Sequence, residues 1–136
     1  MSKRYSFWET QVMTSMQLGR VQLLIMQVLW ARQRATAREI TDTINEFEPI
    51  AHSTVQTLLR ALEEKSAVSH KVEGRTFVFS PCVEEENFKQ NATSDLVHRV
   101  FGGNAANLVA HLLGDKNVSR KEINDIRKLI NQHGKK

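Results

Sequence analysis

The residues of this sequence best suited to chemistry lie on one side of a predicted helix. Apolar residues recur at helical spacing in the segment 52–65, HSTVQTLLRALEEK, and they leave a polar face of hydroxyls, an amide and a guanidinium. With the residue that starts the helix, this polar face comprises His52, Ser53, Thr54, Gln56, Thr57 and Arg60. Such groups can donate to phosphate or contact base edges when a helix lies in the major groove of DNA. An ordinary solvated surface is the alternative, and the neighbouring segments decide between the two.

The sequence also predicts how this helix starts. Ser53 and Gln56 stand three residues apart, the spacing at which a serine and a glutamine can cap each other's backbone amides. We therefore expect a capping box at the first turn.

The sequence contains no motif typical of a catalytic or metal-binding site. The five histidines, at 52, 70, 98, 111 and 133, form no HExxH pair and no cluster at ligand spacing, so we expect surface, capping or packing roles. Cys82 has no basic neighbour to favour its thiolate, and a small buried residue is the better interpretation. No GxSxG motif, phosphate-cradling glycine loop or pair of carboxylates in an obvious cleft is present. The sequence predicts a protein that is not an enzyme and holds no metal or cofactor.

Length and composition bound the architecture. The 136 residues suffice for one domain, or for a small domain with an appendage, and 40% of them are hydrophobic. No apolar run reaches the roughly 18 residues that a membrane span needs, and the N-terminal stretch lacks the apolar core of a signal peptide. The single cysteine excludes an internal disulfide. These features predict a cytoplasmic protein.

The charge is spread evenly along the chain. Residues 1–82 carry ten Lys or Arg against eight Asp or Glu, and residues 83–136 carry nine against seven. The formal net charge of +4 permits nucleic-acid binding without demanding it. The motifs must therefore support any such function.

Two helices are predicted before the polar helix. A broad apolar stripe over residues 18–31 predicts a helix covered on more than one side, and a polar connection follows at 31–35. Thr36 can cap the next helix together with Glu39, and Pro49 ends it. The inner face of that helix is predicted to comprise Ala37, Ile40, Ile44 and Phe47. This second helix, a short loop and the polar helix at 52–65 together match the helix-turn-helix pattern.

A β-hairpin is predicted after the polar helix. The period changes from 3.6 to 2, which indicates strands at 68–72 and 76–80 with a tip at 73–75. Lys71 and Arg75 lie on or beside this hairpin, where a cation can contact phosphate. Three helices followed by such a wing form a winged helix, although the hairpin could instead only cover the core. The predicted fold is mainly α with a small β-hairpin wing (α+β).

The C-terminal third predicts three amphipathic helices: one ending at Gly102, one at 104–113 and one starting with a capping box at Ser119 and Glu122. About 50 residues cannot easily close a core alone, so their apolar faces are expected to pair with a second chain. The expected dimerisation residues are Leu96, Val100, Phe101, Leu108, Leu112, Ile123, Ile126 and Ile130. Residues 1–17 show no clean period and are expected to form an arm, which either touches a DNA backbone or frays.

Taken in order, these segments resemble the penicillinase-repressor family of bacterial winged-helix transcription repressors, the BlaI/MecI/CopY group. The resemblance covers nearly all of 18–132 and rests on LLIMQVLW, ATAREITDTI, TVQTLLRALEEK, EGRTFVFSP, FGG, LVAHLL and SRKEINDIRKLI. It implies a homodimer that represses transcription from a palindromic operator. It also implies a DNA-binding domain at 18–82 and a helical dimerisation domain at 83–136, after the arm expected at 1–17.

The sequence departs from the family pattern in three ways. β-Lactam-responsive members commonly carry a basic residue where Gln56 stands, and an amide there favours adenine over guanine. The resemblance implies a membrane sensor protease as a partner, but His111 and Leu112 stand here in place of the Asn-Phe bond at which such repressors are cut. Copper-responsive members carry a cysteine-rich C-terminal motif, whereas no cysteine follows Cys82 here. The resemblance therefore predicts neither release by that cut nor copper sensing.

A protein-interaction module with the same fold is the alternative function, and the modest net charge is its best support. DNA binding should fall steeply with ionic strength, whereas a hydrophobic contact should hardly respond.

Overall fold

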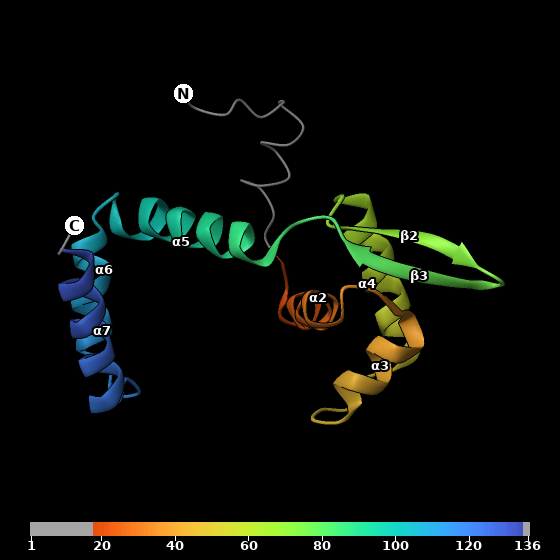
Figure 1. The fold of residues 1–136 in the computed structure, drawn as a ribbon, viewed down its shortest axis with the longest axis horizontal. Coiled ribbons are helices and arrows are strands. Elements are labelled where there is room, and N and C mark those ends of the chain that lie inside the picture. Colours follow the sequence, from red (N-terminus) through yellow and green to blue (C-terminus); the bar gives the residue numbers. More distant parts are fainter. Residues whose placement is uncertain (1–17, 135–136) are drawn as a thin grey trace. The chain divides into compact units, whose positions relative to one another are not determined.

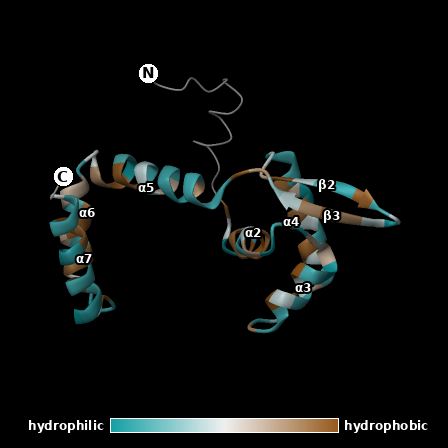
Figure 2. Cartoon of the chain, viewed as in Figure 1, coloured by the Kyte–Doolittle hydropathy of each residue, from teal (hydrophilic) through white to brown (hydrophobic). Residues whose placement is uncertain are grey.

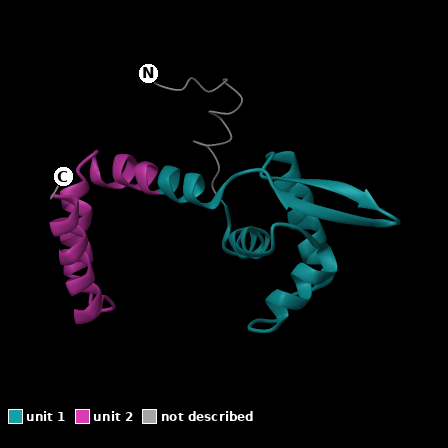
Figure 3. Ribbon diagram, viewed as in Figure 1, with its two compact units in different colours: residues 1–92 teal, residues 93–136 magenta. Residues whose placement is uncertain are grey.

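The computed structural model of this chain describes residues 18–134 (Figure 1), and the predicted arm at 1–17 lies outside them. The described residues form six helices and three strands: α2 (Arg20–Arg32), β1 (Ala35–Thr36), α3 (Ala37–Asn45), α4 (His52–Glu64), β2 (Val68–Glu73), β3 (Thr76–Pro81), α5 (Glu85–Phe101), α6 (Ala105–Leu113) and α7 (Arg120–His133). The predicted fold, mainly helical with a small β wing, is confirmed. Figure 3 shows two compact units, residues 1–92 and 93–136, with α5 running across their division.

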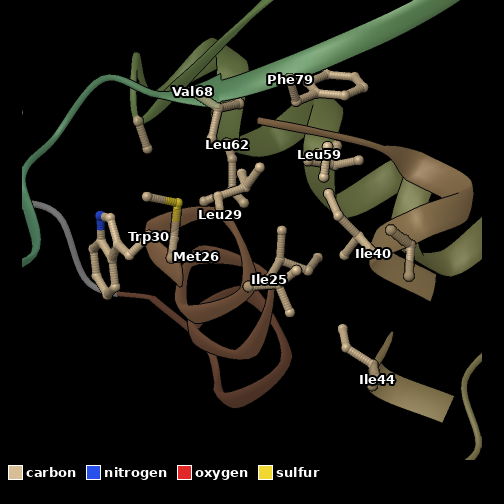
Figure 4. Close-up of a cluster of buried hydrophobic side chains, with 14 residues drawn as sticks. Ile25, Met26, Leu29, Trp30, Ile40, Ile44, Leu59, Leu62, Val68 and Phe79 are labelled. Carbon is tan, nitrogen blue, oxygen red and sulfur yellow. The ribbon is translucent and has the colours of Figure 1, made fainter. Parts of the chain in front are cut away.

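The core of the first unit joins three helices and the sheet. Close-packed apolar side chains from α2, α3, α4, β2 and β3 meet there (Figure 4), among them Ile25, Met26, Leu29, Ile40, Leu59, Leu62, Val68 and Phe79. α2 is buried on several sides, as its broad apolar stripe predicts. The inner residues of α4 are therefore fixed by packing, and its polar residues are left outside.

The first residues of α3 are held by a capping box. The Thr36 hydroxyl accepts a hydrogen bond from the Glu39 amide at 3.1 Å, and the Thr36 amide donates to the Glu39 carboxylate at 2.8 Å. This box confirms the predicted start of the helix. The bond from the Thr36 amide is the main reason why the pKa of Glu39 lies below its ordinary value of 4.5, and Arg32 lowers it further.

We expect the capping box to make the free energy of unfolding depend on pH in the acidic range. A carboxyl with a lowered pKa in the folded state stabilises the protein above its unfolded pKa, and that stability disappears as pH falls through the folded pKa. Glu39→Gln should therefore be less stable than the parent at neutral pH, and the difference should vanish in acid. Urea unfolding at neutral and acidic pH measures this difference. An unchanged gap between the two proteins at both pH values would contradict the role of the charge.

The sheet holds one more strand than the predicted hairpin. The strand order is β1-β3-β2, all antiparallel, and β1 pairs through Ala35 with Phe79 and through Thr36 with Val78. β2 and β3 pair from Val68 opposite Pro81 to Glu73 opposite Thr76. A strand of two residues is too short to show an alternating pattern, so residues 31–35 predict only a connection. β1 links the start of α3 directly to the wing.

Two expectations near the start of α4 are wrong. The helix begins at His52 with Ala51 as an N-cap that has no side-chain bond, so Ser53 and Gln56 form no capping box. Phe47 is 61% exposed and does not line the inner face of α3. The helix ends at Asn45, whose side-chain amide donates to the Ile50 carbonyl at 3.0 Å and accepts from the Ile50 amide at 2.9 Å. That loop turns the chain before Phe47 can reach the core.

The first turns of α5 are anchored to the winged helix. The Trp30 indole donates to the Val83 carbonyl at 2.7 Å, and its ring packs at 5.5 Å from the ring of Phe88. The Cys82 amide donates to the Ala67 carbonyl at 2.8 Å, but its side chain is exposed, so the prediction of a buried cysteine is wrong. Its position just beyond the last residue of β3 leaves the thiol outside the core.

The second unit consists of amphipathic helices without a buried side chain. Ser119 and Glu122 form the predicted capping box at the start of α7, and Asn104 caps α6. In the described helices α5, α6 and α7 no residue is buried, and α6 and α7 carry both hydrophobic and hydrophilic residues (Figure 2). Large apolar side chains are exposed at Leu96, Val100, Leu112, Leu113, Leu129 and Ile130. This unit leaves apolar surface uncovered.

Candidate nucleic-acid interface

The two faces of α4 differ as the sequence predicts. Val55, Leu59 and Leu62 are fully buried on the inner face. The polar residues Ser53, Thr54, Gln56, Thr57 and Arg60 are all exposed. The buried face fixes the helix, so its polar side chains are presented on a rigid element.

His52, the first residue of α4, is held in a defined orientation. The Thr41 hydroxyl donates to the Ala37 carbonyl at 2.7 Å and lies 3.2 Å from His52 Nδ1. A hydroxyl has a single proton, which the carbonyl already takes, so Nδ1 must be the donor in the second bond. This contact turns Nδ1 toward Thr41 and leaves Nε2 on the other edge of the ring.

The wing, comprising β2, β3 and the turn at Gly74 and Arg75, carries the two predicted cations on different sides. Gly74 has φ 67°, which suits the first position of a two-residue hairpin turn and places Arg75 at the tip. Lys71 is exposed but follows His70 in the strand, so the two side chains point to opposite faces of the sheet. His70 and Arg75 line the same groove as residues of α4, and Lys71 does not.

A groove of about 660 Å³ separates α4 from the wing. We call it the α4–wing groove, and its lining residues are Thr36, Ala37, Arg38, His52, Gln56, Arg60, Glu63, Glu64, His70, Arg75, Thr76, Phe77 and Phe79. Four predicted DNA-contact residues, His52, Gln56, Arg60 and Arg75, thus come together in one concave surface. Ser53, Thr54 and Thr57 lie on α4 outside its lining.

The charges of the α4–wing groove favour an anion. Arg38, Arg60 and Arg75 contribute three guanidinium groups, while Glu63 and Glu64 contribute two carboxylates. The Glu63 carboxylate is 2.7 Å from His70 Nδ1, so an imidazole hydrogen bond already occupies it. Guanidinium groups donate to phosphate oxygens in fixed geometry, which suits a nucleic-acid backbone.

Two contacts hold the wing in place. His70 on β2 bonds to Glu63 on α4, and Arg34 forms an ion pair with Glu73 at the end of β2. The first pair joins the wing to α4, and the second joins it to the segment before β1. The wing and α4 therefore form one relatively rigid surface.

Sequence reasoning missed several residues of the groove. Arg38 follows the cap of α3 and carries no motif, but its place in the first turn of a helix beside β1 brings it to the groove. His70, Phe77 and Glu63 were assigned no function, since their contacts join a helix to a hairpin. The alternation of His70 with Lys71 was the one available signal for which side chain faces α4.

The predicted dimerisation residues lie on all three helices of the C-terminal region. Leu96, Val100 and Phe101 belong to α5, Leu108 and Leu112 to α6, and Ile123, Ile126 and Ile130 to α7. Each is exposed or half-buried in the single chain. His111 packs edge-on against Phe101 at 5.3 Å, which joins α6 to the end of α5.

The described residues offer neither a metal site nor a membrane span. Within residues 18–134, no three His, Cys, Asp or Glu side chains gather closely enough to bind a metal ion. None of the helices in that range combines the length and apolar character required to cross a bilayer.

Comparisons with known proteins agree on one family. A family model described as penicillinase repressor matches residues 18–132. The penicillinase repressor of Bacillus licheniformis is 26% identical over 117 residues, which cover 86% of this chain and 91% of that protein. The methicillin resistance regulatory protein MecI of Staphylococcus aureus (strain N315) is 24% identical over 108 residues, 79% of this chain and 88% of that protein.

A similar fold is found in a solved structure. The structure described as the complex structure of hsRosR-S4 matches with a TM-score of 0.55 at 15% sequence identity. The match covers 90% of this chain and 96% of that one. At this identity the likeness concerns the fold alone.

Proposed function

This chain belongs to the penicillinase repressor family, and we propose that it represses transcription as a homodimer bound to a palindromic DNA operator. The family consists of transcription repressors and not of enzymes. The observation that carries the proposal is the exposed polar face of α4 beside a groove with three guanidinium groups. Hydroxyls, an amide and guanidiniums are the groups that proteins use to contact base edges and phosphates.

We assign DNA contacts by position. α4 enters the major groove, with Ser53, Thr54, Gln56 and Thr57 toward the duplex and Arg60 further along the helix. Gln56 suits adenine, because its amide can both accept from N6 and donate to N7. Arg38 and Arg75 contact phosphates on either side of the α4–wing groove. Lys71 contacts phosphate only from the other face of the wing.

The second unit is proposed to join two copies. Its helices expose apolar side chains that one chain cannot cover, among them Val100 and Ile130. Pairing those faces would let two α4 helices reach successive major grooves, roughly 34 Å apart. In this proposal residues 18–82 bind DNA, residues 83–136 dimerise, and the protein works in the cytoplasm.

A membrane sensor protease is a partner that only the family resemblance implies, and the resemblance does not predict release by a cut at the matching bond. The bond between His111 and Leu112 lies inside α6, where His111 Nδ1 is 3.1 Å from the Asn107 carbonyl. A protease needs an extended segment, so α6 would have to unfold locally before a cut there.

Selection from a random duplex library tests the proposed function. The full-length protein should enrich palindromic sequences whose half-sites lie about one helical turn apart. Binding to the selected duplex should weaken steeply as salt rises, because contacts to phosphate release counterions. Failure to bind any duplex at low salt would overturn the proposal and favour a protein-interaction module.

Arg60→Ala should weaken binding to the selected operator by about 1 to 3 kcal/mol, the range expected for loss of a base contact. Fluorescence anisotropy at fixed salt measures the change. Lys128→Ala, which removes an exposed positive charge from the side of α7 away from Ile123 and Ile130, is the control and should bind like the parent. If Arg60→Ala and Gln56→Ala both bind as tightly as the parent, the assignment of α4 is wrong.

A further inference from the structure

Phe77 is a large aromatic side chain left half exposed on the wing. Its exposed fraction is 49%, whereas Phe79, two residues along the same strand, is 7% exposed and belongs to the core. Binding sites are concave and are commonly lined by hydrophobic and aromatic side chains. Phe77 lines the α4–wing groove together with Gln56 and Arg60.

The Phe77 ring is held rigidly. It stacks on the imidazole of His70 with centroids 4.1 Å apart and planes 10° apart. His70 is in turn fixed by its 2.7 Å bond to Glu63 on α4. Phe79 supports both rings, at 5.6 Å from His70 and 6.3 Å from Phe77. The ring is thus positioned before any ligand arrives, which reduces the entropy lost on binding.

The surroundings of this ring suit a DNA strand. Arg38, Arg60 and Arg75 line the same groove, so an occupant should carry negative charge around an apolar part. A DNA strand has that chemistry, since its phosphates alternate with deoxyribose and its thymines carry a methyl group in the major groove. Of the two carboxylates that line the groove, that of Glu63 should repel a phosphate less, because it is already hydrogen-bonded to His70.

We propose that Phe77 packs against an apolar carbon group of the operator, either a thymine C5-methyl group or a deoxyribose. This contact rests on the proposed function and adds a residue outside α4 to the DNA-contacting set. A thymine contact would make the wing contribute to sequence specificity. A deoxyribose contact would strengthen binding to every sequence.

Three variants test the contact on the selected operator. Phe77→Ala should bind roughly tenfold more weakly than the parent, and Phe77→Leu should recover most of the affinity because it restores apolar contact. Phe47→Ala is the matched control, since it removes another exposed phenylalanine that does not line the groove. Thermal unfolding of each variant shows whether it folds. Equal losses of affinity for the Phe77 and Phe47 variants would overturn the proposal.

Replacing operator thymines one at a time by uracil separates the two contact types. Uracil lacks only the methyl group, so a methyl contact predicts one sensitive position per half-site in the parent and none there in Phe77→Ala. A deoxyribose contact predicts that Phe77→Ala binds every duplex more weakly than the parent. It also predicts that no thymine-to-uracil replacement affects the parent more than it affects Phe77→Ala. If the parent binds the operator and Phe77→Ala binds equally well, the contact fails while the proposed function stands. If the parent binds no duplex, both fail.

Discussion

Ile130→Asp is expected to make the protein monomeric and to weaken operator binding by about 100-fold or more. Ile130 is 59% exposed on α7, within the apolar face that we propose pairs with a second copy. An aspartate there would have to lose its water on dimerisation without gaining a partner, which is costly. Linking two half-site contacts raises avidity by about 10² to 10⁴, and a monomer lacks that gain. Sedimentation velocity and anisotropy with the full operator measure the two effects.

Asn124→Asp is the matched control for this variant. It adds the same charge to α7 at an exposed position away from Ile123, Ile126 and Ile130 by helical periodicity. The control should remain dimeric and bind like the parent. A dimeric Ile130→Asp protein at micromolar concentration would show that another surface joins the chains.

Leu59→Ala should lower the free energy of unfolding by about 3 kcal/mol. Leu59 is fully buried on the inner face of α4, between α3 and the sheet (Figure 4). Truncating such a residue removes apolar contact and leaves a cavity, which together cost about 2 to 5 kcal/mol. Urea denaturation followed by circular dichroism measures the loss.

Leu58→Ala provides the comparison, because Leu58 is only partly buried against the same core. It should cost clearly less than Leu59→Ala. Operator binding by folded Leu59→Ala should stay near that of the parent, since the polar face of α4 is unchanged. Similar losses of stability for the two variants would contradict the division of α4 into a buried and an exposed face.

Periodicity and capping pairs predicted most of the first unit. Leu59 and Leu62 recur at a helical interval, and Thr36 and Glu39 stand at capping-box spacing, so local sequence was enough to locate α3 and α4. β1 escaped prediction because two residues carry no period. Phe47 was assigned to the core because its spacing continues the stripe of α3, but the Asn45 side chain ends that helix early.

The predicted part of the candidate site lies on α4, apart from Arg75 on the wing. Gln56 and Arg60 follow from the faces of α4 alone. Arg38 and Phe77 depend on how α3 and the wing pack beside α4, and the bond between His70 and Glu63 joins a strand to a helix. Such contacts depend on tertiary packing, which periodicity does not describe.

The strand order has a consequence for solubility. With β3 in the centre, β2 is an outer strand of the sheet, and no other strand within residues 18–134 pairs with its second edge. Edges of this kind invite a foreign strand to add, and charged side chains are a common protection. Lys71 and Glu73 place opposite charges on that edge, so a neutral residue at 71 would promote aggregation between wings even if it left DNA affinity intact.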